Sequence, residues 1–211
     1  MGKIFAIGDI HGCLGMLTSL FNKLPIDQKD DLIVFLGDYI DRGTDSKGVI
    51  DFILRLREAG FRMVCLAGNH EVMFKNYLSH KNEALFLLNG GCETLAGYPG
   101  TGWADKRKSI PAAHREFINS LVYYHETEDY IFVHAGLRDG IPLARQSEDD
   151  LVWIRTEFYL SQYDFGKDVI FGHTPFDQPF VRFRRIGIDT GAVYGNKLTC
   201  LVLPEMVYYQ V

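Results

Sequence analysis

The chain has 211 residues, of which 47% are hydrophobic and 23% are charged, with a formal net charge of -5 at pH 7. One hydrophobic core serves chains of up to about 250 residues, so we expect a single domain over residues 1–211. The acidic balance argues against nucleic acid as a partner, because nucleic-acid-binding proteins concentrate Lys and Arg on one face. No apolar run approaches the roughly 18 residues that cross a membrane, which argues against a membrane partner.

Five short apolar runs predict buried strands, and each run ends in a polar cluster. They are residues 4–7, 32–36, 63–67, 131–133 and 169–171. Between the first three runs, residues 14–21 and 49–56 place their apolar side chains on one helical face. Strands that alternate with helices pair in parallel, so the sequence predicts a layered α/β fold.

The remaining segments differ from this alternating pattern. Residues 72–128 are mostly helical in pattern, with breaks at Gly90-Gly91 and at Pro99-Gly100, and we expect them to cap one side of the core. After Phe180 three strand-like pieces follow, with a turn at residues 194–196. They indicate antiparallel strands, and hence either a mixed sheet or a second sheet.

Polar residues follow all five of the predicted strands. They are Asp9 and His11, Asp38, Asn69 and His70, His134, and His173. The carboxyl ends of parallel strands meet at one edge of a sheet, where the loops diverge and side chains can converge. One such residue alone is typical of a turn or a helix cap, but five clusters together predict a shared site.

The chemistry of these residues indicates a site for two divalent metal ions. Carboxylate, imidazole and one amide oxygen, without thiolate, suit Mn, Fe or Zn better than Ca or Cu(I), and we expect Mn. Two carboxylates against two divalent ions leave a net charge of about +2. Such a site would hold a phosphate dianion in spite of the acidic surface.

Five motifs resemble those of the calcineurin-like metallophosphoesterase superfamily. They are GDIHG at 8–12, GDYIDRG at 37–43, GNHE at 68–71, HAG at 134–136 and GHTP at 172–175. More narrowly, they are similar to bacterial and phage members of the phosphoprotein phosphatase family, including the bacteriophage lambda type. LVWIR at 151–155 and GIDTGAVYGNKLTCL at 187–201 also match, so the likeness covers nearly the whole chain.

The resemblance implies a fold and a set of metal ligands. The fold would be a layered sandwich of two mixed β-sheets flanked by helices, with the metals at the C-terminal ends of a central βαβαβ unit. One ion would be held by Asp9, His11 and Asp38. The other would be held by Asp38, Asn69, His134 and His173, with Asp38 as the bridge. Two ions about 3.5–4 Å apart can share a water, lower its pKa to form a bridging hydroxide, and align it for in-line attack on phosphorus.

The same resemblance assigns four further residues to catalysis. His70 would give a proton to the leaving group, with Asp41 behind it to accept a hydrogen bond from its other ring nitrogen. Arg42 and Arg155 would bind the phosphate oxygens, because a guanidinium presents a planar fork that stays charged. Without the LVWIR match, Arg155 would equally suit a salt bridge to the acidic run at 148–150.

Three functions are compatible with these residues. The first is a protein serine/threonine phosphatase that acts on a phosphoprotein or phosphopeptide, with phosphotyrosine possible. The second is a hydrolase of dinucleoside tetraphosphates, but its symmetrical branch is expected to lack Asp41 and to carry GNHD in place of GNHE. The third is a scaffold without catalysis, which should have lost ligands or His70. Asp41 and Glu71 therefore favour the phosphatase.

The cysteines and the start of the chain bear on where the protein acts. Four widely spaced cysteines without a CxxC pair indicate neither a zinc knuckle nor a disulfide framework. The chain runs from Met-Gly-Lys directly into a strand-like segment, without the apolar stretch of a signal peptide. We therefore expect a cytoplasmic protein, and a monomer. His80, His114 and His125 lie outside the strand-end clusters and are expected at the surface.

Overall fold

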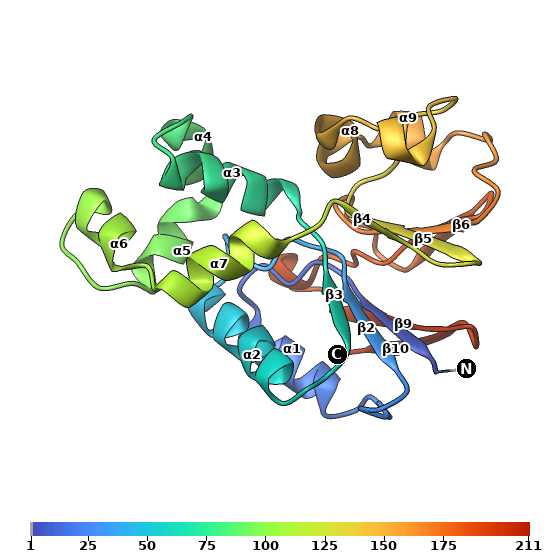
Figure 1. Cartoon of the computed structure of the whole chain (residues 1–211), viewed down its shortest axis with the longest axis horizontal. Coiled ribbons are helices and arrows are strands. Elements are labelled where there is room, and N and C mark those ends of the chain that lie inside the picture. Colours follow the sequence, from blue (N-terminus) through green and yellow to red (C-terminus); the bar gives the residue numbers. More distant parts are fainter. Residues whose placement is uncertain (1) are drawn as a thin grey trace.

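Two five-stranded β-sheets form the centre of the computed structural model, which describes residues 2–211 (Figure 1). The first sheet has the order β10-β9-β1-β2-β3. Its strands β1 (Ile4–Ile7), β2 (Leu32–Phe35) and β3 (Met63–Cys65) are parallel. Strand β9 (Thr199–Leu203) pairs antiparallel with β1, and β10 (Val207–Gln210) pairs antiparallel with β9 at the edge. The βαβαβ unit predicted from the sequence is therefore present.

The second sheet has the order β4-β5-β6-β8-β7. Its three central strands, β5 (Tyr130–Val133), β6 (Asp168–Phe171) and β8 (Arg185–Gly187), are parallel. The edge strands β4 (Tyr124–Glu126) and β7 (Phe180–Arg182) are antiparallel to their neighbours. The predicted sandwich of two mixed sheets is thus confirmed.

The hydrophobic core is divided into three layers by the two sheets. Alternate residues of a strand face opposite sides of a sheet, so Ala6 packs between the sheets while Phe5 and Ile7 face outward. Helices α1 (Leu14–Phe21) and α2 (Ser46–Glu58) cover the outer face of the first sheet. Helices α8 (Glu148–Trp153) and α9 (Thr156–Tyr159) cover the outer face of the second sheet, with a short turn η2 (Leu143–Arg145) before them.

A helical segment joins the two sheets and extends to one side of the first (Figure 1). Its members are α3 (Asn69–Leu78), α4 (Glu83–Phe86), the turn η1 (Leu87–Gly91), α5 (Cys92–Ala96), α6 (Trp103–Ser109) and α7 (Ala112–Ser120). The predicted break at Gly90 is confirmed, because Gly90 has a φ of 99° and interrupts the helical backbone. A further turn, η3 (Ala192–Tyr194), precedes β9.

Two expectations from the sequence were wrong in detail. Strand β4 lies within the segment that was expected to be helical, since three residues are too few to show a period. His114 is buried rather than exposed. Burial is tolerated because both ring nitrogens have hydrogen-bond partners, Tyr98 Oη at 2.8 Å and Asp51 Oδ1 at 2.8 Å. Within residues 2–211, every helix is too short or too polar to cross a lipid bilayer.

Candidate metal centre

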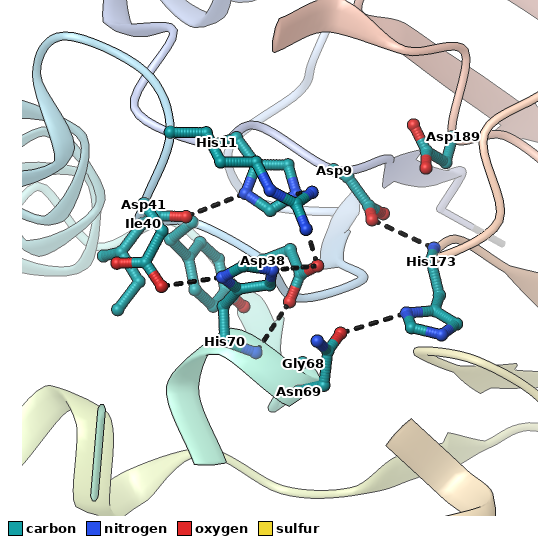
Figure 2. Close-up of polar contacts among 12 residues, drawn as sticks. Asp9, His11, Asp38, Ile40, Asp41, Gly68, Asn69, His70, His173 and Asp189 are labelled. Carbon is teal, nitrogen blue, oxygen red and sulfur yellow. Dashed lines mark hydrogen bonds and ion pairs between the residues drawn. The ribbon is translucent and has the colours of Figure 1, made fainter. Parts of the chain in front are cut away.

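The six expected metal ligands converge at the carboxyl ends of parallel strands from both sheets, and Figure 2 shows all of them except His134. Four come from loops of the βαβαβ unit, as predicted, and two come from the second sheet, where His134 follows β5 and His173 follows β6. All six side chains are buried, with exposed fractions of at most 4%. The site therefore lies across the junction of the two sheets rather than on the edge of one.

Asp38 lies between two groups of candidate ligand atoms. Its Oδ2 lies 3.4 Å from His11 Nε2, and its Oδ1 lies 3.4 Å from His134 Nε2. Ligand atoms of His11, Asp38 and His70 lie within 4.8 Å of one another, and so do those of Asp38, His134 and His173. Asp38 belongs to both groups, which is the position that a bridging ligand requires.

Asn69 joins the second group through its amide oxygen. Asn69 Oδ1 lies 3.0 Å from His134 Nε2. It also lies 3.0 Å from His173 Nδ1, a contact that Figure 2 shows. Asp9, by contrast, is outside both groups. Its Oδ2 accepts a hydrogen bond of 2.9 Å from the backbone N–H of His173, and its Oδ1 is buried without a hydrogen-bond partner. His70, rather than Asp9, belongs to the group of nearby ligand atoms with His11 and Asp38.

Backbone carbonyls orient two of the imidazoles. His11 Nδ1 donates to the Ile40 carbonyl at 2.8 Å, and His134 Nδ1 donates to the Leu36 carbonyl at 2.9 Å. Each bond leaves Nε2 as the unprotonated nitrogen that can bind a metal. Arg42 Nη1 lies 2.9 Å from His11 Nε2, so this guanidinium has to move for His11 to coordinate an ion.

Burial is the largest influence on the pKa values of these site residues. Burial lowers the pKa of His11 to about 3 and that of His173 to about 2, so both imidazoles are neutral. Burial and then the neighbouring Asp189 raise the pKa of Asp9 well above its usual range. Burial likewise raises the pKa of Asp189 to about 6. Within residues 2–211, two buried atoms of the site have no hydrogen-bond partner: Oδ1 of Asp9 and Nε2 of His173. Together with the neutral imidazoles, they are atoms that a divalent cation could bind.

The loops that carry these side chains are strained, and Glu71 holds two of them together. Five site residues have left-handed backbones, with φ of 46° to 73°: His11, Asp38, Asp41, Arg42 and His173. The Glu71 carboxylate accepts hydrogen bonds of 2.9 Å from the backbone N–H groups of Asp38, Tyr39 and Gly68. The sequence did not indicate this structural role of Glu71, because it depends on contacts across 32 to 33 residues of chain.

His70 and Asp41 form a buried pair beside the candidate ligands (Figure 2). His70 Nδ1 donates to Asp41 Oδ2 at 2.6 Å, and both residues have an exposed fraction of 0%. His70 Nε2 has no hydrogen-bond partner and lies 4.0 Å from Asp38 Oδ2. The free nitrogen therefore faces the site while the other nitrogen is held.

The two arginines differ in how close they lie to the site. Arg42 is half-buried, with its guanidinium 5.7 Å from the centre of the Tyr194 ring. Arg155 is exposed at the start of α9. Its positive charge still reaches the site. The pKa of His173 is lowered by burial, by His134 and, to a smaller extent, by Arg155. The acidic run before Arg155 does not hold it in the part of the chain that the structure describes, since Asp150 pairs with Arg138 instead.

Fold and site together define a metallophosphoesterase. The family model of calcineurin-like phosphoesterases matches residues 2–198, and the chain belongs to that family. The sequence resemblance to this family is thus confirmed. The family implies divalent metal ions, for which the buried Asp, His and Asn side chains are candidate donors.

Relatives of two kinds share the chain's length. It is 30% identical to the asymmetrical bis(5'-nucleosyl)-tetraphosphatase PrpE of Bacillus subtilis, over 95% of this chain and 90% of that protein. It is also 30% identical to serine/threonine-protein phosphatase 1 of Salmonella typhimurium, over 93% of this chain and 89% of that protein. A crystal structure of a putative diadenosine tetraphosphatase superposes with a TM-score of 0.79 at 25% identity, covering 100% of this chain and 93% of that one.

Proposed function

We propose that the protein is a metal-dependent phosphomonoesterase that removes phosphate from serine or threonine side chains of a phosphoprotein. The His70–Asp41 pair carries this proposal. An alkoxide leaving group is strongly basic and needs a proton as the ester bond breaks. A buried imidazole that is protonated on both nitrogens, with its Nδ1–H held by the Asp41 carboxylate, can give the proton on Nε2 and is left neutral.

The donors proposed for the metal ions are Asp9, His11, Asp38, Asn69, His134 and His173, and we propose Mn as the ion, with Fe or Zn as alternatives. When bound, the ions would supply a water of lowered pKa and would neutralise phosphate charge. For His11 to take part, Arg42 has to leave its Nε2. A guanidinium released in this way can form the paired hydrogen bonds that a phosphate accepts. Arg155, exposed at the rim, is the second residue proposed to bind phosphate oxygens.

Hydrolysis of dinucleoside tetraphosphates is the second candidate, and the relative from Bacillus subtilis favours it. The sequence argument from Asp41 and Glu71 was directed against the symmetrical branch alone, whereas this relative is an asymmetrical enzyme. The chemistry of the leaving group weighs the other way. A nucleoside phosphate leaves as a stable anion, because its own pKa is about 6. Such a reaction makes little use of a buried proton donor.

A side-by-side assay decides between the two. The protein loaded with Mn is given phosphoserine, phosphothreonine and phosphotyrosine peptides and diadenosine tetraphosphate, and kcat/KM is measured for each. Asp38→Asn, purified in the same way, controls for contaminating hydrolases. We expect the highest kcat/KM with a phosphoserine or phosphothreonine peptide. If diadenosine tetraphosphate exceeds every peptide by about tenfold or more, a margin of about 1.4 kcal/mol, the second candidate replaces the first.

A further inference from the structure

The Asp41 carboxylate is held on both of its oxygens. Oδ2 accepts from His70 Nδ1, as described above, and Oδ1 accepts a hydrogen bond of 2.6 Å from the hydroxyl of Thr94. Thr94 lies in α5, 53 residues further along the chain, and its exposed fraction is 0%. A hydroxyl at this distance from a carboxylate makes a short, charge-assisted hydrogen bond.

The same hydroxyl also contacts the backbone of Asp41. The Asp41 N–H donates to Thr94 Oγ1 at 2.8 Å and to Ser46 Oγ at 2.9 Å, and the two hydroxyl oxygens lie 3.0 Å apart. Asp41 has a φ of 73°, a backbone conformation that a residue with a side chain rarely adopts. Thr94 and Ser46 therefore fix both the strained backbone and the carboxylate of Asp41.

The segment that carries Thr94 also touches the next residue of the loop. The Arg42 N–H donates to the Gly90 carbonyl at 3.3 Å, and a Cβ on Gly90 would lie 2.7 Å from the Arg42 nitrogen. Residues 87–96 thus form a brace against the loop at 41–42. Asp41 and Thr94 are both buried, with exposed fractions of 0%. The Asp41 carboxylate therefore has no second orientation, because rotation would remove the Thr94 donor from Oδ1.

We propose that Thr94 is a positioning residue for proton transfer to the leaving group, acting through Asp41 on the orientation of His70. This inference rests on the role of His70 in the proposed function. Thr94 does not touch the reacting atoms. Its hydroxyl sets the plane of the carboxylate, the carboxylate sets the plane of the imidazole, and the imidazole presents Nε2 to the departing oxygen.

The test compares Thr94→Val, which keeps the shape and removes the hydroxyl, with Thr94→Ser, which restores the hydroxyl. Each is loaded with Mn and assayed on phenyl phosphate and on p-nitrophenyl phosphate. Nitrophenolate is a stable anion and needs little protonation. We therefore expect Thr94→Val to lower kcat on phenyl phosphate by about ten- to hundredfold, the worth of one hydrogen bond to a charged group. The loss on p-nitrophenyl phosphate should be clearly smaller, and Thr94→Ser should recover both activities.

The matched control is Thr18→Val, because the Thr18 hydroxyl bonds only to the Leu14 carbonyl of its own helix, at 2.9 Å. It should leave both activities unchanged. Thr94→Val should fold, since Ser46 still accepts from the Asp41 N–H. If Thr94→Val does not fold, Thr94→Ala against Thr94→Ser gives the same comparison. Equal loss on both substrates, no loss, or failure of Thr94→Ser to recover activity would each overturn the proposal.

A double-mutant cycle separates this proposal from the proposed function. In a His70→Asn background, Thr94→Val should cost nothing further, because a residue that acts only through His70 has nothing left to position. An additive loss would overturn the role of Thr94. If His70→Asn alone loses both substrates equally, the assignment of His70 as proton donor is what fails. If His70→Asn shows the leaving-group effect and Thr94→Val does not, only the inference on Thr94 fails.

Discussion

His70 has two possible roles, since its Nε2 both belongs to a group of candidate ligand atoms and is the free nitrogen of the pair with Asp41. We predict that His70→Asn keeps two metals per chain and lowers kcat on a phosphoserine peptide by about 10²–10⁴, the usual worth of a positioned general acid. The activity on p-nitrophenyl phosphate should fall much less. Elemental analysis together with the two assays checks this, and loss of a metal would make His70 a ligand.

Asp38 and Asn69 occupy different positions among the ligand atoms. Asp38 belongs to both groups, whereas Asn69 Oδ1 contacts only His134 and His173. We predict that Asp38→Asn loses more metal than Asn69→Asp, because the first removes a negative charge shared by both ions and the second adds one beside a single ion. Both variants should lose activity. Equal metal content by elemental analysis would contradict the bridging position of Asp38.

At the scale of elements, the turn η1 is where the helical segment contacts the loop at residues 41–42. Gly90 has a φ of 99°, and a Cβ there would meet the backbone of Arg42. We predict that Gly90→Ala lowers the free energy of unfolding by about 1–3 kcal/mol, through strain and steric contact, and also lowers kcat. Gly102→Ala is the matched control, since nothing lies within 4 Å of its added Cβ. Chemical denaturation and the peptide assay measure both effects.

The elements that the sequence predicted correctly are those with strong periodic patterns. The runs before Asp9, Asp38 and Asn69 showed both the strands and the site, because a parallel strand and its terminal loop are adjacent in sequence. Strands β4 and β7 escaped notice, since neither lies in an apolar run that ends in a polar cluster. Thr94 could not be found either, because its contact with Asp41 depends on how α5 packs. Long-range packing is what short sequence patterns do not contain.

At the scale of the whole molecule, the buried groups make stability depend on pH and metal together. Burial and Asp38 raise the pKa of Glu71 to about 8, above the value of about 4.3 in an unfolded chain. The stability this group contributes is present below about pH 4.3 and is lost as pH rises through about 8. The pKa of His11 is lowered, so this residue makes the fold less stable as the pH falls, and it does so only below about pH 6.5.

We therefore predict that the metal-free protein melts at a lower temperature at about pH 8.5 than at about pH 6.5, because Glu71 loses its proton in this range and the buried Cys65 thiol, whose pKa is raised to about 11, acts in the same direction. Added Mn should remove or reverse this dependence, because ligands bind a metal in their deprotonated forms. Thermal melts in chelator and in Mn measure the difference. Glu71→Gln in chelator is the control and should flatten the dependence, while an unchanged slope would contradict the role of Glu71.

The junction of the two sheets has a consequence for the order of events when the chain folds. Asp9 and the backbone of His173 are 164 residues apart in sequence and are in contact in the site. The ion proposed to be held by Asp38, Asn69, His134 and His173 would bind only after both sheets have formed and docked, which is a late step for contacts of such high contact order. Ions that bind the finished structure alone slow its unfolding and leave the rate of folding unchanged. Metal would thus lengthen the lifetime of the folded enzyme without guiding the chain towards it.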